Sequence, residues 1–202
     1  MQNPAILAEA AEAVDKEAAK QQQSVVAQMV KKNHDALFND AGSPRIGAEK
    51  PALTLVYFTD YNCVFCKKFD ADIEKLLKTY PQVAVVLKPL PYRAETSLTS
   101  ARLALTVWEQ QPKNFLKLHE RLMAKKGNHD EASIAAALDK TGIKLKEPSK
   151  ASLDTINENL TLAQQLGVQG TPATLVGNEL ISGAVPYAQL EAAVKGALQA
   201  KP

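Results

Sequence analysis

The sequence predicts an α/β fold with an inserted helical block, preceded by a long N-terminal helix. Three observations lead to this class. The apolar, β-rich run Leu53 to Phe58 leads into the motif Cys63-Val64-Phe65-Cys66, and a helical pattern follows the motif. Residues 95–166 then carry helical patterns alone, and a strand pair with a last helix closes the chain. A length of 202 residues suits one such domain with an appendage.

Residues 1–35 are predicted to form a helical arm for self-association. Asn3 is a favourable N-cap, Pro4 is a favourable first helical residue, and the stretch to Lys32 is rich in Ala, Gln, Glu and Lys without any Gly. Its large apolar residues lie at the two ends, and its middle is almost entirely Ala and polar. A helix with so little to bury needs a packing partner in water. We expect a homo-oligomer, with a dimer favoured and a trimer possible.

Residues 36–202 are predicted to form a single α/β domain. A turn-rich loop separates two short strands, expected near Ala36–Phe38 and Arg45–Ile46. The strand before the cysteine motif pairs with an apolar strand from Val83 to Leu87, and a helix from Lys67 to Tyr80 connects them. This is a right-handed βαβ unit, whose two parallel strands should be buried.

The helical insert, about residues 95–166, is predicted to contain four helices. They are expected at residues 96–110, from Pro112 onwards, from Asp130 to Gly142, and at 149–166. The residues of the last helix expected to face the core are Leu153, Ile156, Leu160 and Ala163. Gly167 is expected to end that helix. The apolar stripes of the insert, including Trp108 and His119, are interpreted as plain helical core.

The C-terminal segment has the pattern of a β-hairpin followed by a helix. Gly170-Thr171-Pro172 precedes a predicted strand at residues 173–176. Gly177-Asn178 is a two-residue turn signal that leads to a return strand at residues 179–182. A helix that begins at or next to Pro186 closes the domain.

The spacing of the two cysteines indicates thiol–disulfide chemistry, because CxxC at the junction of a strand and a helix is the layout of a redox site. A helix N-terminus offers unpaired N–H groups and partial positive charge, which stabilise a thiolate at Cys63. Cys66 lies one turn further along and is predicted to be the shielded partner that closes an intramolecular disulfide. The flanking Lys67 and Lys68 are given no catalytic role.

A zinc site and a purely structural disulfide both fit the motif less well than redox chemistry. A zinc site needs about four ligands, and the motif supplies two. The histidines, His34, His119 and His129, show no metal-ligand spacing. A purely structural disulfide would close too short a loop to stabilise much. We therefore expect neither a metal nor a cofactor, and a binding protein with a structural or metal-holding CxxC stays as an alternative.

Composition and cysteine usage bear on partners and location. The net charge of +2 gives no indication of nucleic-acid binding, and no apolar run approaches the ~20 residues that span a bilayer. Residues 1–7 lack the basic and apolar regions of a signal peptide. No cysteine occurs outside the motif, which suits an oxidising compartment. We predict a periplasmic protein whose signal peptide has been removed.

The order of these features resembles the thioredoxin superfamily, and the helical insert makes the chain similar to the DsbA family of bacterial thiol–disulfide oxidoreductases. The resemblance covers about residues 37–200. It rests on three motifs: Cys63-Val64-Phe65-Cys66, residues 115–119, and residues 167–172. It implies a catalytic domain at residues 36–202 that forms or isomerises disulfides in unfolded or misfolded secreted proteins, with a membrane redox partner.

The resemblance also implies the residues that shape the site around the cysteines, which are Val64, Phe65, Thr171 and Pro172. The Thr171–Pro172 bond is expected to be cis and to lie beside the CxxC. A cis bond is inexpensive before proline, and the exposed backbone of Thr171 would offer an edge to an extended substrate.

Three departures from the family pattern modify the expected activity. Val64-Phe65 replaces the Pro-His of the strongest oxidants, which predicts a milder oxidant. Tyr57 stands where thioredoxin and DsbA carry a buried acid, so a carboxylate relay to Cys66 is not expected from that position. Thr171 and the run Phe58-Thr59-Asp60 resemble the dimeric isomerases of the DsbC type. A reductase that serves one dedicated partner is the remaining alternative.

Overall fold

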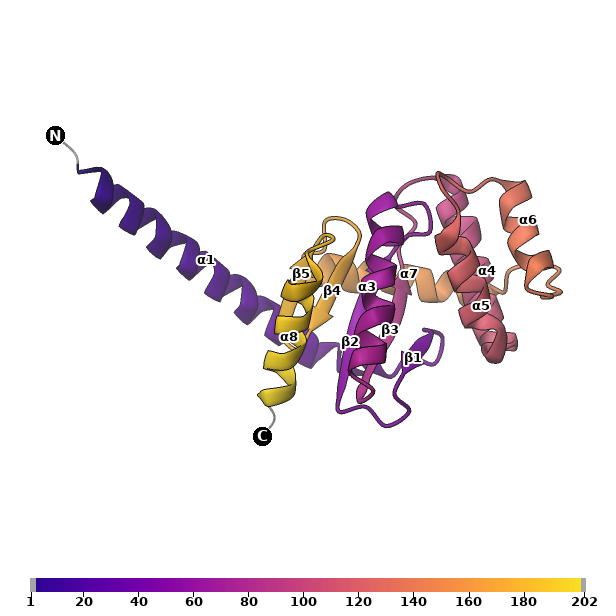
Figure 1. Ribbon diagram of the computed structural model, residues 1–202, viewed down its shortest axis with the longest axis horizontal. Helices are drawn as coiled ribbons and strands as arrows, with labels where there is room; N and C mark the ends of the chain where they lie inside the picture. The colour runs from indigo at the N-terminus through magenta and orange to yellow at the C-terminus, as the bar shows by residue number, and fades with distance from the viewer. Residues whose placement is uncertain (1–2, 201–202) are drawn as a thin grey trace.

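The computed structural model describes residues 3–200 as a mixed sheet, helices on both of its faces, a helical block at one end and a projecting N-terminal helix (Figure 1). In chain order the elements are α1 (Pro4–Lys32), α2 (His34–Phe38), β1 (Arg45–Gly47), β2 (Leu53–Thr59), α3 (Val64–Thr79), β3 (Val83–Pro89), α4 (Glu95–Gln110), a 3-10 turn η1 (Pro112–Asn114), α5 (Phe115–Ala124), α6 (Glu131–Lys140), α7 (Lys150–Leu166), β4 (Ala173–Val176), β5 (Glu179–Ser182) and α8 (Tyr187–Gln199).

The sheet has the strand order β1-β3-β2-β4-β5. β2 and β3 are parallel and are connected through α3, which confirms the predicted βαβ unit. β4 pairs antiparallel with β2, so that Ala173 lies opposite Phe58. This pairing brings the start of β4 next to the end of β2, where the cysteine motif begins. The segments around residues 60 and 172 are therefore neighbours in space.

Alternation along β2 divides the core into two layers. Leu55 and Tyr57 belong to a cluster that includes side chains of α3 and α8. Val56 and Phe58 belong to a second cluster, formed with α7 and the end of α1. All four of these side chains are fully buried, and burying an aliphatic or aromatic side chain of this size contributes about 1.5–3 kcal/mol. The two faces together fix the position of β2, from which the cysteine motif follows.

The helical insert lies at one end of the sheet, and α7 leads back to the sheet (Figure 1). Gly167 ends α7 in the left-handed conformation, φ 79°, as expected. The expectation for Leu153 was wrong, because it is 37% exposed whereas Ile156 and Ala163 are buried. Leu153 lies near the start of α7, where the helix has only one packed side.

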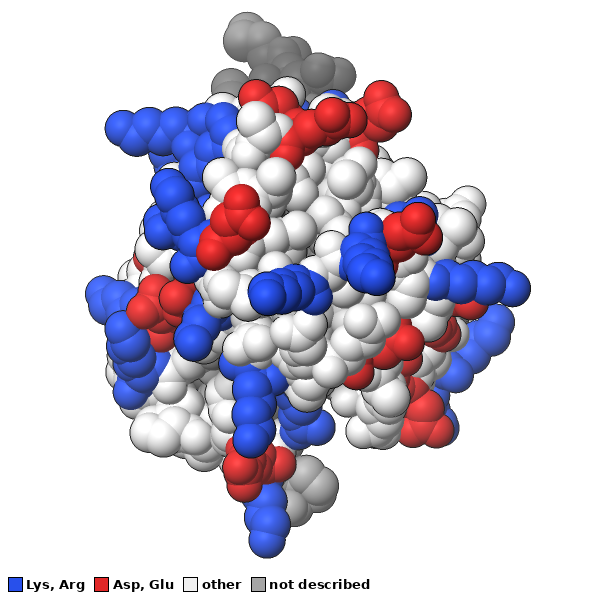
Figure 2. Space-filling model, turned by 90° about the vertical axis from the view of Figure 1, so that its right-hand side faces the viewer, with Lys and Arg blue, Asp and Glu red and all other residues white. Residues whose placement is uncertain are grey.

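Lys/Arg and Asp/Glu side chains are interspersed over the face of the molecule in Figure 2.

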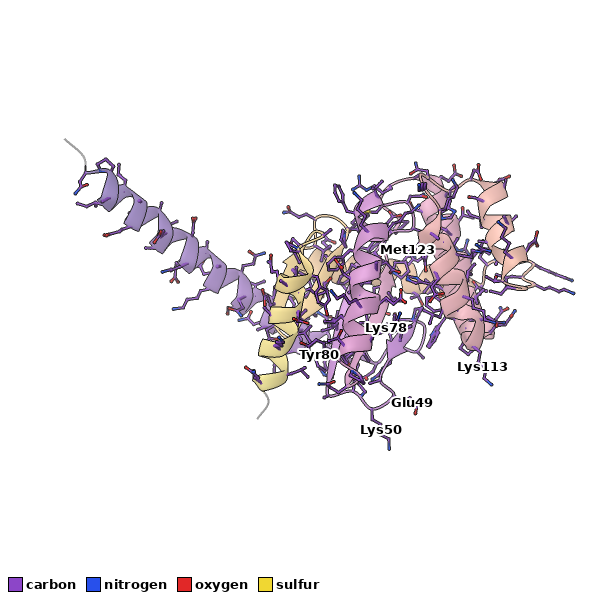
Figure 3. The ribbon with its side chains drawn as sticks, viewed as in Figure 1. Glu49, Lys50, Lys78, Tyr80, Lys113 and Met123 are labelled. Atoms are coloured by element: carbon purple, nitrogen blue, oxygen red, sulfur yellow. The ribbon has the colours of Figure 1, made fainter. Side chains whose placement is uncertain are left out.

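α1 begins as predicted, with Asn3 accepting a hydrogen bond from the Ala5 main-chain N–H. Its residues from Asn3 to Val25 are exposed, and their side chains extend into solvent (Figure 3). Val26 is the first buried residue, and Met29 and Val30 pack against the core. None of the helices within residues 3–200 is both long and apolar enough to span a bilayer.

The strand expected near Ala36–Phe38 is instead the short helix α2. A short apolar run does not distinguish a strand from a buried helical turn. Here the helix is favoured because one turn buries Leu37 completely against the second core layer, and because Asn39 N–H closes the turn onto the Asp35 carbonyl.

Candidate active site

The two cysteines occupy the N-cap and the third position of α3. The helix begins at Val64, three residues before the expected start at Lys67, so that Cys66 lies inside its first turn. Cys63 has the extended backbone of an N-cap, φ −84° and ψ 118°, and its Sγ accepts the main-chain N–H of Cys66 at 3.3 Å. The sulfur thus takes the place of the side-chain oxygen that usually caps a helix.

The environments of the two thiols separate their pKa values. The hydrogen bond with the Cys66 thiol is the largest cause that lowers the pKa of Cys63 from 9.0 to about 5, and it acts against the effect of burial. The bond from the Cys66 main-chain N–H and the charge of Arg93 lower this pKa further. Burial raises the pKa of Cys66, and its hydrogen bond with Cys63 adds to this. Both cysteines are buried free thiols, at 1% and 0% exposure. Their exposure is almost equal, so the two thiols are distinguished by their hydrogen bonds and by the deeper burial of Cys66 inside the first turn of α3.

The shift of Cys63 makes the stability of the reduced protein depend on pH. Because its pKa is lower in the folded than in the unfolded state, the thiolate stabilises the reduced fold fully above about 9. This contribution decreases below that pH and is lost as the pH falls through about 5.

The predicted site residues from the distant C-terminal segment do reach the cysteines. The Thr171–Pro172 bond is cis. The Cys63 thiol donates a hydrogen bond to the Thr171 carbonyl at 3.4 Å. Val64 and Phe65, between the cysteines, are 56% and 57% exposed. The structure therefore places Thr171 against the first sulfur and leaves two apolar side chains in solvent beside it.

A cavity of about 410 Å³ lies beside Thr171, lined by Tyr92, Arg93, Gln169, Gly170 and Thr171. Its two walls are the loops that follow β3 and precede β4. Asp60 holds the first wall, because its Oδ2 accepts the main-chain N–H groups of Tyr92 and Arg93 at 3.0 Å each. The sequence marked Asp60 only through the resemblance of residues 58–60 to the DsbC type, and it did not mark Tyr92 or Arg93, because these contacts join segments about thirty residues apart.

Tyr57 occupies the position of the missing acid and is tied to the main chain. Its hydroxyl donates to the Cys66 carbonyl at 3.3 Å and accepts from the Thr59 hydroxyl at 3.3 Å. Burial raises the pKa of Tyr57, so the phenol stays neutral at physiological pH. Its contact supports the first turn of α3 and provides no carboxylate base for Cys66.

Two further side chains connect the motif to the helical insert. Lys67 is half-buried and donates to the carbonyls of Lys125 and Gly127 at 2.5 and 2.7 Å. Its ammonium group is therefore bound to the loop between α5 and α6 and is not a free surface charge. His119, expected to be plain core, is buried and lies 2.9 Å from the Tyr61 hydroxyl through Nδ1 and 2.8 Å from Asp70 Oδ1 through Nε2. These contacts position the loop. Among residues 3–200, no group of three or more His, Cys, Asp or Glu side chains is arranged to hold a metal ion.

The family follows from comparison with known proteins. The model of the DSBA-like thioredoxin domain matches residues 54–195. The chain belongs to this family. A periplasmic thioredoxin-like protein from Salmonella enterica serovar Typhimurium is 53% identical, with a TM-score of 0.81 over 83% of this chain and 96% of that one. The catalytic domain of Proteus mirabilis ScsC is 49% identical, with a TM-score of 0.83 over 86% and 98%.

A structure of Proteus mirabilis ScsC in a transitional conformation is 48% identical, with a TM-score of 0.83 over 98% of this chain and 90% of that one. These matches confirm the predicted DsbA-like fold and activity. The chain is a periplasmic thiol–disulfide oxidoreductase similar to ScsC, and it carries the CxxC pair at Cys63 and Cys66. Its substrates are proteins. Because the chain belongs to this family, the alternative of a binding protein with a structural or metal-holding CxxC is set aside.

The geometry predicts that the two thiols of the reduced protein differ in reactivity. Iodoacetamide at pH 7 should modify Cys63 at least tenfold faster than Cys66, because alkylation follows the thiolate fraction. Mass spectrometry of peptides from a time course gives both rates, and the urea-unfolded protein is the control, in which the rates should converge. Faster labelling of Cys66 in the folded protein would reverse the assignment.

Proposed function

We propose that this protein is a disulfide isomerase that also forms disulfides, acting on unfolded or misfolded secreted proteins in the periplasm. Cys63 is the attacking thiol and Cys66 the resolving one. The observation that carries the proposal is the position of the Cys63 sulfur. It receives hydrogen bonds first from the Cys66 thiol and then from the Cys66 main-chain N–H, so its pKa is near 5 and a thiolate is ready at neutral pH. Isomerisation begins with this reduced form, and stabilising the thiolate stabilises that form.

The reaction consists of balanced thiol–disulfide exchanges. The Cys63 thiolate attacks one sulfur of a wrong substrate disulfide, which forms a mixed disulfide and releases a substrate thiolate. That thiolate then attacks another substrate disulfide, and rearrangement finally returns Cys63 as a thiolate. When rearrangement stalls, Cys66 loses its proton and attacks Cys63, which releases reduced substrate and leaves the Cys63–Cys66 disulfide. A membrane redox partner would reduce this disulfide again.

The surface around the cysteines suits unfolded chains of varied sequence. Val64, Phe65 and Tyr92 are large apolar side chains at 56%, 57% and 43% exposure. Exposed apolar groups of this kind bind the apolar side chains that a misfolded protein presents, without selecting a sequence. The cavity beside Thr171 gives an extended segment room next to the first sulfur. Val64, Phe65, Thr171 and Pro172 are thus proposed as the residues that shape the site.

The arm is proposed to hold copies of the protein together, as a dimer or a trimer. Leu7, Val14 and Val25 are 56%, 67% and 50% exposed. They are separated by seven and eleven residues, about two and three turns of an α-helix, so they share one face. An exposed apolar stripe on a helix of 29 residues is the surface on which helices associate. Association would place several Cys63 thiolates around one substrate.

The shares of this chain that two related structures match are consistent with an arm at residues 1–35 and a catalytic domain at 36–202. The catalytic domain of Proteus mirabilis ScsC corresponds to 86% of this chain, and a structure of that protein in a transitional conformation corresponds to 98%. The difference is 12% of the 202 residues, or about 24 residues, which is shorter than the proposed arm of 35. We propose the same division here.

The reaction is tested with scrambled ribonuclease and with reduced ribonuclease side by side, and oxidised glutathione is supplied as the oxidant for the reduced substrate. The wild type should restore activity to both, and Cys63→Ser should restore neither, a loss of more than about a hundredfold, because the attacking thiolate is gone. Cys66→Ser should accumulate mixed disulfides with substrate on non-reducing gels. A wild type that reduces the scrambled substrate without restoring its activity would favour the dedicated reductase.

The arm is tested by placing charges on its apolar stripe. Leu7→Lys/Val14→Lys should convert the oligomer to a monomer in light scattering and lower isomerisation several-fold, while dithiol oxidation continues. Ala5→Lys/Ala8→Lys adds the same charge away from the stripe and should stay oligomeric. A monomeric wild type would contradict the role of the arm, and a monomeric variant with full isomerase activity would contradict its link to function.

A further inference from the structure

Asn62, the residue before Cys63, joins the active-site loop to two parts of the helical insert. It is buried, at 4% exposure. Its Nδ2 donates to the hydroxyls of Thr96 and Ser97 at 2.8 and 3.0 Å, at the start of α4. Its Oδ1 accepts the main-chain N–H of His129 at 2.7 Å, in the loop between α5 and α6. Every donor and acceptor of the amide except one lone pair is used.

The main chain at this position is fixed as well. Asn62 N–H donates to Asp60 Oδ1 at 2.9 Å, and Cys63 N–H donates to the Asp60 carbonyl at 3.0 Å. Asn62, which directly precedes the reactive cysteine, is therefore held by hydrogen bonds within its own loop and by hydrogen bonds to the insert. This arrangement uses more long-range polar contacts than a surface turn requires.

We propose that Asn62 is a positioning residue through which the helical insert keeps Cys63 at the N-cap of α3 and so sets its reactivity. The proposal rests on the proposed role of Cys63 as the attacking thiol. It assigns to the insert, beyond covering the sheet, a direct part in tuning the redox pair. His129, Thr96 and Ser97 are the insert residues that act through Asn62.

The physical reason is the sensitivity of the capping bond to distance. The Cys66 main-chain nitrogen and Cys63 Sγ are 3.3 Å apart, an ordinary length for a hydrogen bond to sulfur, and the bond weakens as its length and angle depart from this geometry. Without the amide of Asn62, the loop is free to shift by a few tenths of an ångström. The thiolate then loses donors, the pKa of Cys63 rises, and the disulfide becomes a weaker oxidant because the reduced form is less stabilised.

A buried amide elsewhere in the insert provides a matched control. Asn159 on α7 is fully buried, and its Nδ2 donates to the Pro89 carbonyl at 3.1 Å. It also connects the insert to the sheet, but the hydrogen bonds of its side chain reach Lys88 and Pro89 of β3 and neither cysteine. Replacing either asparagine by alanine removes a buried amide that bridges two elements. Only Asn62 should affect the thiol.

The experiment measures the pKa of Cys63 by thiolate absorbance at 240 nm in the full-length reduced protein. Asn62→Ala should raise this pKa by about one unit, which is a tenfold increase in the affinity of the thiolate for a proton. It should also make the reduction potential more negative in equilibration with glutathione. Asn159→Ala should lower the melting temperature and leave both thiol readings unchanged.

A second variant approaches the same contact from the insert. Thr96→Val/Ser97→Ala removes both acceptors of the Asn62 amide and leaves the active-site loop intact, so it carries the test if Asn62→Ala does not fold. It should raise the pKa in the wild type and add nothing in the Asn62→Ala background. An unchanged pKa in these variants, or an equal shift in Asn159→Ala, would overturn the proposal. A wild-type pKa near 9 would instead contradict the proposed function itself.

Discussion

The hydrogen bond that caps α3 with the sulfur of Cys63 is the interaction on which the site depends. It places one thiol at the positive end of a helix and leaves the other one turn inside, where burial keeps it protonated. Chemically identical side chains acquire different roles through this placement alone. The strand order also builds the site, because the pairing of β4 with β2 places the Thr171 carbonyl within hydrogen-bond distance of the Cys63 sulfur.

The loop that carries the motif is held mostly from outside the βαβ unit. Asp60 binds the segment after β3, and Lys67 binds the loop between α5 and α6. These contacts pair main-chain groups of loops that are exposed or only partly buried. They make the redox pair part of a frame that includes the insert. The exposed apolar residues, by contrast, lie at the rim, where mobility helps a site to accept many substrates.

The sequence was sufficient for the parts of the fold that depend on local pattern. Propensity, capping and turn residues predicted α1, the βαβ unit and the β4–β5 hairpin, and the CxxC predicted the chemistry. Local pattern failed where tertiary contacts decide. The short apolar run around Leu37 has the pattern of a strand, but the structure buries Leu37 in a helical turn. The sequence also does not show that Lys67 binds two main-chain carbonyls of the insert. The bonds of Asp60 and Asn62 span thirty to seventy residues, and no sequence spacing predicts them.

The central claim is that Cys63 is ionised at neutral pH because its sulfur accepts hydrogen bonds from the Cys66 thiol and from the first turn of α3. The most direct test is the absorbance of the reduced protein at 240 nm from pH 3 to 10, with the oxidised protein subtracted. We predict one transition with a midpoint near 5 and an amplitude of a single thiolate. A first transition near the ordinary value of 9.0, or an amplitude of two thiolates below pH 7, would contradict the account.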